Sequence, residues 1–312
     1  MKKNNNTLSI IAGPCSIDIK NVEELYEISR ITVKDRSGEI YKAIFGVRIV
    51  GLKSRTEFDK YNKKYMGIDF EFYVNKINFP NTQAETNSNK LFPPSVKIAQ
   101  EFVSKTGLLV ATEIMFPHIQ IPYYAHIPKK KMLFWNPSVN QLGWSVYQTA
   151  YYCAQKGWYL GLKNGKWFNQ KINADTMSSV EKSWLGLSTY ATETKDIIFI
   201  QRGVDIPHNE LFRNYPIHKA SERVKGLSKK PMFFDPSHSF GSKLRNDIVS
   251  LTLDAMKLRT SKGDYLYDGL LIETGNSQSD TDQHISISEL KLLTQELSQF
   301  RDINSPSNPL VN

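Results

Sequence analysis

The sequence predicts an α/β protein built as a single (β/α)8 TIM barrel with a long insertion after its second strand. Short apolar segments alternate with segments of helical period, which is typical of parallel βα units. Eight of the apolar segments have strand length, and most of them end in polar residues. The 312 residues are compatible with one barrel, because such domains routinely exceed about 200 residues. A doubly wound open sheet is the alternative architecture.

The expected strands are Leu8–Ala12, Tyr41–Leu52, Leu108–Ile114, Met132–Trp135, Tyr159–Leu162, Ile197–Gln201, Met232–Asp235 and Gly269–Glu273. The expected helices are Val22–Val33, Val96–Lys105, Gln141–Lys156, Ser179–Thr194, Asn246–Leu258 and Ile287–Phe300. The last helix has the clearest period, with large apolar residues three or four positions apart. Segments 117–130 and 208–227 are less regular, because their prolines limit helix formation.

The domain is expected to span residues 1–304, with residues 57–94 as the insertion. This insertion is rich in Asn, Lys, Tyr and Phe and is almost wholly polar between Gln83 and Lys90. Connections of this length are usually functional or disordered, so we expect this one to cover the barrel mouth. Residues 305–312 contain Ser, Pro and Asn and are expected to form a disordered tail.

Composition narrows the possible partners. The chain has 40 Lys and Arg against 31 Asp and Glu, a net charge of +9, which suits nucleic acid, an anionic membrane or phosphorylated small substrates. Basic residues are interspersed with acidic ones and no nucleic-acid recognition motif is present. No apolar run approaches the roughly 18 residues of a membrane span. Two cysteines exclude a disulfide framework and no signal peptide is recognisable, so we expect a cytoplasmic protein.

Polar residues at the strand ends predict the functional face, because the carboxyl ends of barrel strands meet on one side. Several strand ends carry cations, namely Arg48, Lys53, Arg55, Lys163 and Arg202. Bringing these charges together costs free energy unless anions lie between them. This favours a substrate with phosphate and carboxylate groups over structural salt bridges at the rim. Cys15, His238 and Glu273, with Asp280 or Asp282, make a sulfur, nitrogen and oxygen ligand set. Such a set suits Mn, Fe, Co or Zn better than Mg or Ca. A buried cysteine in the core is the alternative for Cys15.

Nine short motifs together resemble one family. They are Ala-Gly-Pro-Cys-Ser at 12–16, Arg48, Lys-Ser-Arg-Thr at 53–56, Thr-Glu at 112–113, Lys-Asn-Gly at 163–165, Arg-Gly at 202–203, Arg-Asn at 213–214, Asp-Pro-Ser-His at 235–238 and Glu273. In order and approximate spacing, these motifs resemble the class I 3-deoxy-7-phosphoheptulonate (DAHP) synthases. That group includes 3-deoxy-D-manno-octulosonate 8-phosphate synthase. The resemblance runs from Ile10 to about Leu297.

The resemblance implies a role for each matching residue. The metal ligands would be Cys15, His238, Glu273 and Asp280, with Asp282 as the alternative to Asp280, and the cofactor a divalent Mn, Fe, Co or Zn ion. The substrate-binding residues would be Arg48, Lys53, Arg55, Thr56, Glu113, Lys163, Arg202 and His238. Of these, Lys163, Arg55 and Lys53 would be catalytic.

The implied activity is the metal-dependent condensation of phosphoenolpyruvate with a phosphorylated aldose. With erythrose 4-phosphate the products would be DAHP and phosphate, the first step of the shikimate pathway of aromatic amino acid biosynthesis. Arabinose 5-phosphate is an alternative acceptor, and a non-catalytic barrel that binds metal or a phosphorylated metabolite is an alternative of another class. The resemblance also implies a homo-oligomer with small-molecule substrates and neither nucleic acid nor membrane as partner.

The sequence departs from the family at one phosphate-binding position. The family carries Gly-Ala-Arg after its fourth strand, whereas this chain has Asn136-Pro137-Ser138 and no following arginine. Ser54 also replaces the proline of the family's Lys-Pro-Arg-Thr. We expect Lys129–Lys131 or a residue of the insertion to replace the missing cation.

Overall fold

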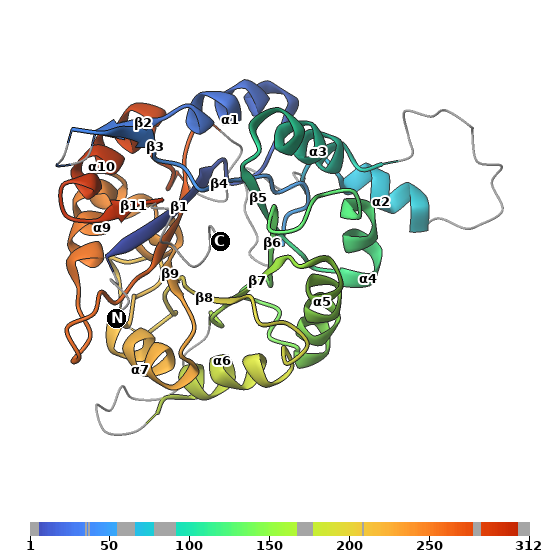
Figure 1. Ribbon diagram of the computed structural model, residues 1–312. Helices are drawn as coiled ribbons and strands as arrows, with labels where there is room; N and C mark the ends of the chain where they lie inside the picture. Colours follow the sequence, from blue (N-terminus) through green and yellow to red (C-terminus); the bar gives the residue numbers. More distant parts are fainter. Residues whose placement is uncertain are drawn as a thin grey trace.

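The computed structural model describes residues 6–34, 36, 38–54, 66–77, 92–166, 177–207, 209–276 and 282–304. Within these ranges, eight parallel strands form a barrel surrounded by helices (Figure 1). In barrel order they are β1 (Thr7–Gly13), β4 (Gly46–Arg48), β5 (Leu109–Glu113), β6 (Met132–Trp135), β7 (Tyr159–Lys163), β8 (Ile197–Gln201), β9 (Met232–Phe234) and β10 (Gly269–Glu273). The parallel pairing of β10 with β1 closes the ring, which confirms the barrel and excludes the open sheet.

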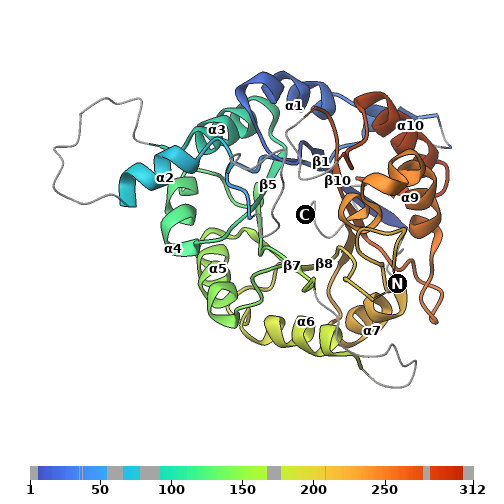
Figure 2. The same cartoon turned by 180° about the vertical axis from the view of Figure 1, so that it is seen from behind.

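The helices of the outer ring follow the strands in alternation, as Figure 2 shows from behind. They are η1 (Ile19–Asn21), α1 (Val22–Ser29), α3 (Pro94–Thr106), α4 (Pro117–Gln120), η3 (Ile121–Tyr124), α5 (Gly143–Lys156), α6 (Ser179–Thr189), α7 (His218–Ser228), α8 (Pro236–Phe240), η4 (Ser242–Asp247), α9 (Ile248–Lys257) and α10 (Ile287–Ser298). Ser178 and Ser286 begin α6 and α10 with capping boxes. Gly107 and Gly157 end α3 and α5 in the left-handed conformation.

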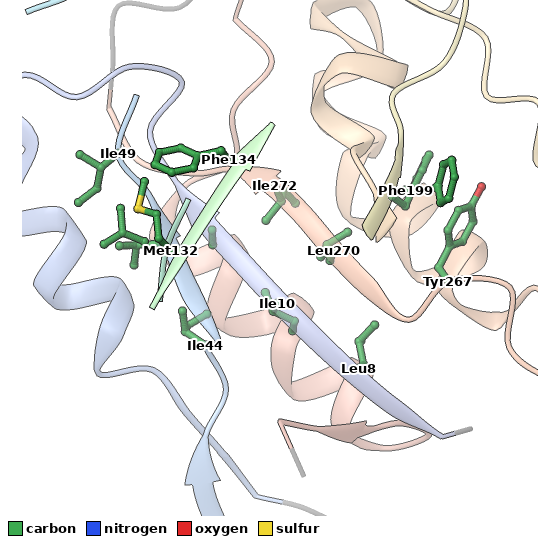
Figure 3. Packing of buried hydrophobic residues seen from close by; sticks show 14 of the residues in the cluster. Leu8, Ile10, Ile44, Ile49, Met132, Phe134, Phe199, Tyr267, Leu270 and Ile272 are labelled. Atoms are coloured by element: carbon green, nitrogen blue, oxygen red, sulfur yellow. The ribbon is translucent and has the colours of Figure 1, made fainter. Parts of the chain in front are cut away.

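Side chains alternate between the barrel interior and the helix layer along each strand. Leu8 and Ile10 of β1 and Leu270 and Ile272 of β10 belong to the cluster that includes the helices (Figure 3). The intervening residues form a separate interior cluster made of barrel residues such as Ile11. This period of two determines which residue at each strand end faces the barrel mouth.

Two expected elements at the start of the chain were wrong. The helix expected over 22–33 ends at Ser29, and the strand expected over 41–52 contributes only β4 to the barrel. Between them, β2 (Thr32–Lys34) and β3 (Ile40–Lys42) pair as an antiparallel hairpin outside the barrel. The β-branched run Ile31-Thr32-Val33 explains the early end of α1, since such residues favour extended backbone.

The irregular segments also contain more helix than their prolines suggest. Pro216 lies before α7 rather than inside it, so it does not interrupt the helix. In the insertion, α2 (Phe70–Ile77) lies outside the helix ring beside α3 and α4 (Figures 1 and 2). There Phe72 packs edge-on against Tyr123, with ring centroids 5.4 Å apart. Residues 55–65, 78–91 and the tail 305–312 lie outside the described ranges, within which every helix is too short or too polar to cross a membrane.

Arg301 closes the end of the barrel opposite the mouth. Its side chain is 1% exposed and donates hydrogen bonds to the backbone carbonyls of Asn6, Thr7, Met256 and Tyr267, at 2.9 to 3.2 Å. These carbonyls precede or begin β1, end α9 and precede β10. Next to it, β11 (Asp302–Ile303) pairs with the first residues of β1. One guanidinium therefore joins three segments far apart in sequence.

His218 on α7 makes the stability of the fold depend on pH. Its Nδ1 lies 2.7 Å from the Tyr267 hydroxyl, and burial lowers its pKa from 6.5 to about 4. Because the folded state binds this proton more weakly than the unfolded chain, stability is complete above pH 6.5 and falls towards pH 4. We expect His218 to contribute a loss of at most about 3 kcal/mol across that window.

Urea unfolding of the unsubstituted chain and His218→Gln at several pH values checks this expectation. The variant should lose this part of the pH dependence. The difference between the two proteins isolates His218, because Asp69, whose pKa burial raises to about 6, acts with the opposite sign in both. Parallel stability curves for the two proteins would contradict the assignment.

Candidate active site

The last inward-facing positions of the barrel strands form a ring at the mouth. Glu113 continues the inward set of Leu109 and Ala111, and Glu273 pairs in register with Gly13. The complete ring is Gly13, Arg48, Glu113, Trp135, Lys163, Arg202, Asp235 and Glu273. Three cations and three carboxylates thus project from six different strands into one space, as the strand-end pattern predicts.

Glu273 is the fully buried carboxylate at the end of β10. Its Oε1 accepts a hydrogen bond from Arg48 Nη2 at 3.1 Å, and its Oε2 accepts one from Gln283 Nε2 at 2.8 Å. Burial alone would raise its pKa, but the neighbouring His238 and the cations Arg48 and Lys53 hold the pKa well below the ordinary value. Glu273 is therefore a carboxylate anion at neutral pH.

Asp235 is the second fully buried carboxylate and lies between two basic groups. Its Oδ2 is 2.9 Å from Lys163 Nζ and 2.9 Å from His238 Nδ1. Against the effect of burial, these neighbours hold the pKa of Asp235 well below its usual range. Asn214 Nδ2 donates to the His238 carbonyl at 2.6 Å and fixes the backbone there. The orientation of the imidazole is thus set from two sides.

Trp135 lies between two cations on the inner wall. Its ring centroid is 5.7 Å from Arg48 Cζ and 5.3 Å from Lys163 Nζ. Its Nε1 donates a hydrogen bond to Glu113 Oε2 at 3.3 Å. The indole face therefore stabilises two buried positive charges while its edge holds the carboxylate of β5.

The predicted metal ligands are brought together in part. His238 Nε2 lies 3.7 Å from Glu273 Oε1, while the Nδ1 contact with Asp235 is the one that metal-ligating histidines commonly make. The Cys15 sulfur accepts a hydrogen bond from Lys53 Nζ at 2.7 Å. Burial lowers the pKa of His238, which keeps its imidazole in the neutral form that a metal requires. The imidazole nitrogen of His238 and the carboxylate oxygen of Glu273 are therefore donors that suit a transition-metal ion.

The rest of the four-ligand set stays a prediction. Asp280 lies outside the described residues, and Asp282 has an exposed side chain 3.8 Å from His284 Nε2. Within the described ranges, no group of three or more His, Cys, Asp or Glu side chains is arranged to hold a metal ion.

Two buried arginines have N–H groups without partners among the described residues. These groups are Nε and Nη1 of Arg48 and Nε of Arg202. Arg202 is 3% exposed, and its Nη1 donates a hydrogen bond to Asn214 Oδ1 at 2.8 Å. Burial and the neighbouring Arg213 lower the pKa of Arg202 to about 10, so it is still charged at neutral pH. Buried guanidinium donors at a barrel mouth are the groups that bind phosphate and carboxylate oxygens.

Most of the predicted site residues do meet at this mouth. Arg48, Glu113, Lys163, Arg202 and Glu273 face it from their strand ends. Cys15, Lys53 and His238 follow the ends of β1, β4 and β9 and contact the network described above. Arg55 and Thr56 lie outside the described residues.

The sequence interpretation did not single out Trp135, Asp235 and Gln283 as site residues, although all three contact the charged residues of the mouth. Trp135 and Asp235 follow the same inward alternation as the residues that were predicted, so strand period is the signal that identifies them. Gln283 lies in no expected strand or helix and has no such signal.

The expected replacement of the missing arginine by Lys129–Lys131 is wrong. These residues immediately precede β6, and the Lys131 carbonyl accepts a hydrogen bond from Val110 near the start of β5. Lys130 pairs with Asp196, which lies just before β8. The three lysines are therefore at the amino ends of the strands, on the side of the barrel opposite the mouth.

A closed (β/α)8 barrel whose mouth is lined by buried cations and carboxylates is the class that this fold and site define. Among solved structures, the chain is similar to phospho-2-dehydro-3-deoxyheptonate aldolase (DAHP synthase) from Thermotoga maritima, with 19% sequence identity and a TM-score of 0.66 over 94% of this chain and 69% of that one. It is also similar to a truncated form of 3-deoxy-D-arabino-heptulosonate 7-phosphate synthase from the same organism, with 18% identity and a TM-score of 0.61 over 94% and 86%.

At these identities the likeness establishes the common fold. No protein-family model matches the sequence, and no curated protein matches it.

Proposed function

We propose that this barrel is a divergent member of the class I DAHP synthase family that condenses phosphoenolpyruvate with a phosphorylated aldose, with erythrose 4-phosphate as the acceptor. The observation that carries the proposal is the pair of buried arginines, Arg48 and Arg202, which project into the mouth beside Lys163 and have N–H groups without partners within the described ranges. A substrate with both phosphate and carboxylate groups satisfies such donors, whereas a neutral substrate would leave them desolvated without partners. The order of the motifs and the shared fold add support.

The proposed reaction consumes phosphoenolpyruvate, the aldose and one water, and it forms one C–C bond and releases inorganic phosphate. The methylene carbon of phosphoenolpyruvate forms a C–C bond to the aldehyde carbon, whose oxygen becomes a hydroxyl by taking a proton. Water adds to the carbon that bears the phosphate, and one of its two protons replaces the proton given to the aldehyde oxygen. The C–O bond to phosphate then breaks, the carbon becomes a ketone, and inorganic phosphate leaves with the second proton.

The charged residues of the mouth bind the substrates, and one of them donates a proton. Lys163, Arg202 and Arg55 hold the phosphate and carboxylate of phosphoenolpyruvate and so fix the face that reacts. Lys163 is also the proton donor to the aldehyde oxygen, with Asp235 2.9 Å away to keep it oriented. Arg48 binds the same anionic groups, Glu113 completes the wall of the mouth, and Lys53 and Thr56 hold the aldose.

Cys15, His238, Glu273 and Asp280 would hold a divalent Mn, Fe, Co or Zn ion. Such an ion polarises the aldehyde as a Lewis acid when bound. Lys53 would then exchange its contact with the Cys15 sulfur for one with the aldose.

Release of inorganic phosphate tests the activity. The protein is mixed with phosphoenolpyruvate and Mn²⁺, Co²⁺ or Zn²⁺, and with either erythrose 4-phosphate or arabinose 5-phosphate, and the products are identified by mass. We expect metal-dependent phosphate release with erythrose 4-phosphate and none after chelation. Release with arabinose 5-phosphate alone would assign the other acceptor, and no release with either aldose would overturn the proposed activity.

The two cysteines offer a matched test of the metal assignment. Cys15→Ser is expected to lower metal affinity at least about tenfold, because it removes the one soft ligand of the set. Cys153→Ser on α5 should leave metal binding unchanged, since that thiol donates to the Tyr159 carbonyl within the helix layer. Calorimetric titration with Zn²⁺ measures both without turnover. Equal affinities of the two variants would contradict the assignment of Cys15.

The predicted cytoplasmic location and homo-oligomeric assembly, and the absence of nucleic-acid or membrane partners, are part of this proposal. They rest on the composition and on the resemblance.

A further inference from the structure

The backbone of Lys53 is attached to a later part of the insertion. Arg48 ends β4, and Lys53 lies in the segment that leaves the barrel after it. The Lys53 N–H donates a hydrogen bond to the Met66 carbonyl at 2.9 Å, and the Asp69 N–H donates one to the Gly51 carbonyl at 3.0 Å. These two hydrogen bonds join residues 51–53 to residues 66–69, directly before α2.

Asp69 fixes residues 66–69 to the start of α3, which lies beside α2 (Figure 1). The residue is 2% exposed, and its Oδ1 accepts from the Ser95 N–H at 2.9 Å while its Oδ2 accepts from the Ser95 hydroxyl at 2.5 Å. Pro93 occupies the N-cap position of α3 and has no side-chain acceptor, so Asp69 supplies one from earlier in the chain. The start of this 13-residue helix also favours the negative charge of Asp69.

Glycines allow the two segments to approach each other closely. A Cβ on Gly51 would lie 2.2 Å from Asp69 Oδ2 and 2.3 Å from Ser95 Oγ. A Cβ on Gly67, whose φ is +99°, would lie 2.2 Å from the Gly51 carbonyl oxygen. Gly51, two residues before Lys53, is thus packed directly against the contact between Asp69 and Ser95.

The side chain of Lys53 reaches the mouth from this backbone. Its Nζ donates to the Cys15 sulfur at 2.7 Å, and the residue is 8% exposed. Cys15 follows β1, which pairs with β4, so the contact joins the loops after two neighbouring strands. A lysine has a long flexible stem, so the position of its ammonium depends on where its backbone is held.

We propose that Asp69 is a positioning residue for Lys53. By capping α3 it holds residues 66–69 in place, and these residues hold the backbone of Lys53 so that its ammonium stays beside Cys15. That Lys53 binds the aldose rests on the proposed function, whereas the placement of Lys53 by Asp69 does not. The insertion thereby acts on one defined residue of the mouth.

Labelling of lysines with acetic anhydride, followed by peptide mass spectrometry, tests the proposal without turnover. In the Asp69→Ala variant, loss of the cap should raise the acetylation rate of Lys53 about tenfold, because the segment opens more often. Ser95→Ala removes only the hydroxyl contact and should raise the rate by a smaller factor. Asp69→Asn should keep the rate low, since asparagine caps helices about as well as aspartate does.

Two controls separate this effect from general loosening of the barrel. Lys163, which is 2% exposed and paired with Asp235, is the internal reference within each protein and should keep its rate. Ser178→Ala is the matched variant, because Ser178 also caps a helix, α6, by accepting from the Glu181 N–H. That helix precedes β8, across the barrel from β4, so Lys53 labelling should not change.

Turnover gives a second measurement. In the Asp69→Ala variant, KM for erythrose 4-phosphate should rise about tenfold, while KM for phosphoenolpyruvate should change by less than about twofold. Equal increases in the two KM values would contradict an effect through Lys53.

The outcomes distinguish the positioning role from the proposed activity. Faster labelling of Lys53 in Asp69→Ala alone, in a protein that turns over neither aldose, would support the role of Asp69 and overturn the proposed reaction. Unchanged Lys53 labelling in both Asp69→Ala and Ser95→Ala would overturn the role of Asp69, whether or not the protein turns over. Equal increases at Lys53 and Lys163, or an equal effect of Ser178→Ala, would also overturn it.

Discussion

Asp235→Asn is expected to lower the free energy of unfolding by about 3–5 kcal/mol. The carboxylate is fully buried and lies 2.9 Å from both Lys163 Nζ and His238 Nδ1. The amide removes the negative charge and leaves the buried ammonium of Lys163 without its counterion, which costs more than the pair itself contributes. Urea unfolding followed by circular dichroism measures the change.

Asp196→Asn is the control for this substitution. Asp196 also pairs with a lysine, Lys130, at 2.7 Å, but both side chains are about 30% exposed. Its removal should cost no more than about 1 kcal/mol, as for surface ion pairs in general. Equal unfolding midpoints for Asp235→Asn and Asp196→Asn would refute the view that the mouth network is held together by buried charge.

The same substitution should act on the chemistry through His238. In the variant the charged acceptor of Nδ1 is replaced by a neutral amide, which sets the tautomer and ring orientation less firmly, and metal affinity should fall about 10–100-fold. Zinc titration of the folded variant measures this separately from stability.

Arg301→Leu is expected to destabilise the barrel by at least about 4 kcal/mol. The substitution removes the Arg301 donor from the backbone carbonyls of Thr7, Met256 and Tyr267, while the Asn6 carbonyl keeps the N–H of Asp302. Each buried carbonyl without a partner costs about 1–3 kcal/mol. Thermal and urea unfolding both measure the loss.

Arg259→Leu is a close control for Arg301→Leu. Both guanidinium groups stack on Tyr265, at 4.0 Å for Arg259 and 3.9 Å for Arg301. Arg259 donates instead to the carbonyl of Gly263 in an exposed turn. We expect a loss below about 1 kcal/mol for Arg259→Leu, so similar losses in the two variants would contradict the role of the buried carbonyls.

The barrel strands were predictable because each one is a short apolar segment that the sequence shows without reference to distant residues. Strands such as Met132–Trp135 and Gly269–Glu273 have the same bounds in the sequence interpretation and in the structure. The hairpin of β2 and β3 was not predictable in this way, since both strands are short, half-exposed and set between a helix and a barrel strand. Apolar content alone merges Tyr41 with β4, although Ala43 and Ile44 already pack in the helix layer.

The mouth was predictable only where a strand end carries a reactive residue type. Arg48, Lys163 and Glu273 met that condition and lie together. Gln283 did not, because it donates to Glu273 from outside any expected strand or helix, and sequence order gives no measure of that closeness. The same reason explains why a basic run at Lys129–Lys131 was given a role at the wrong end of the barrel.

The pairing of β1 with β10 has a consequence for how the protein is made. Ser9 pairs with Gly269, so one edge of β1 lacks its neighbour until the ribosome has synthesised the chain as far as Gly269 and beyond. An open apolar strand edge is a template for association between nascent chains. Contacts of such long sequence separation also form slowly after release. Yield in the cell should therefore depend more on chaperones and on translation speed than the stability of the finished barrel would suggest.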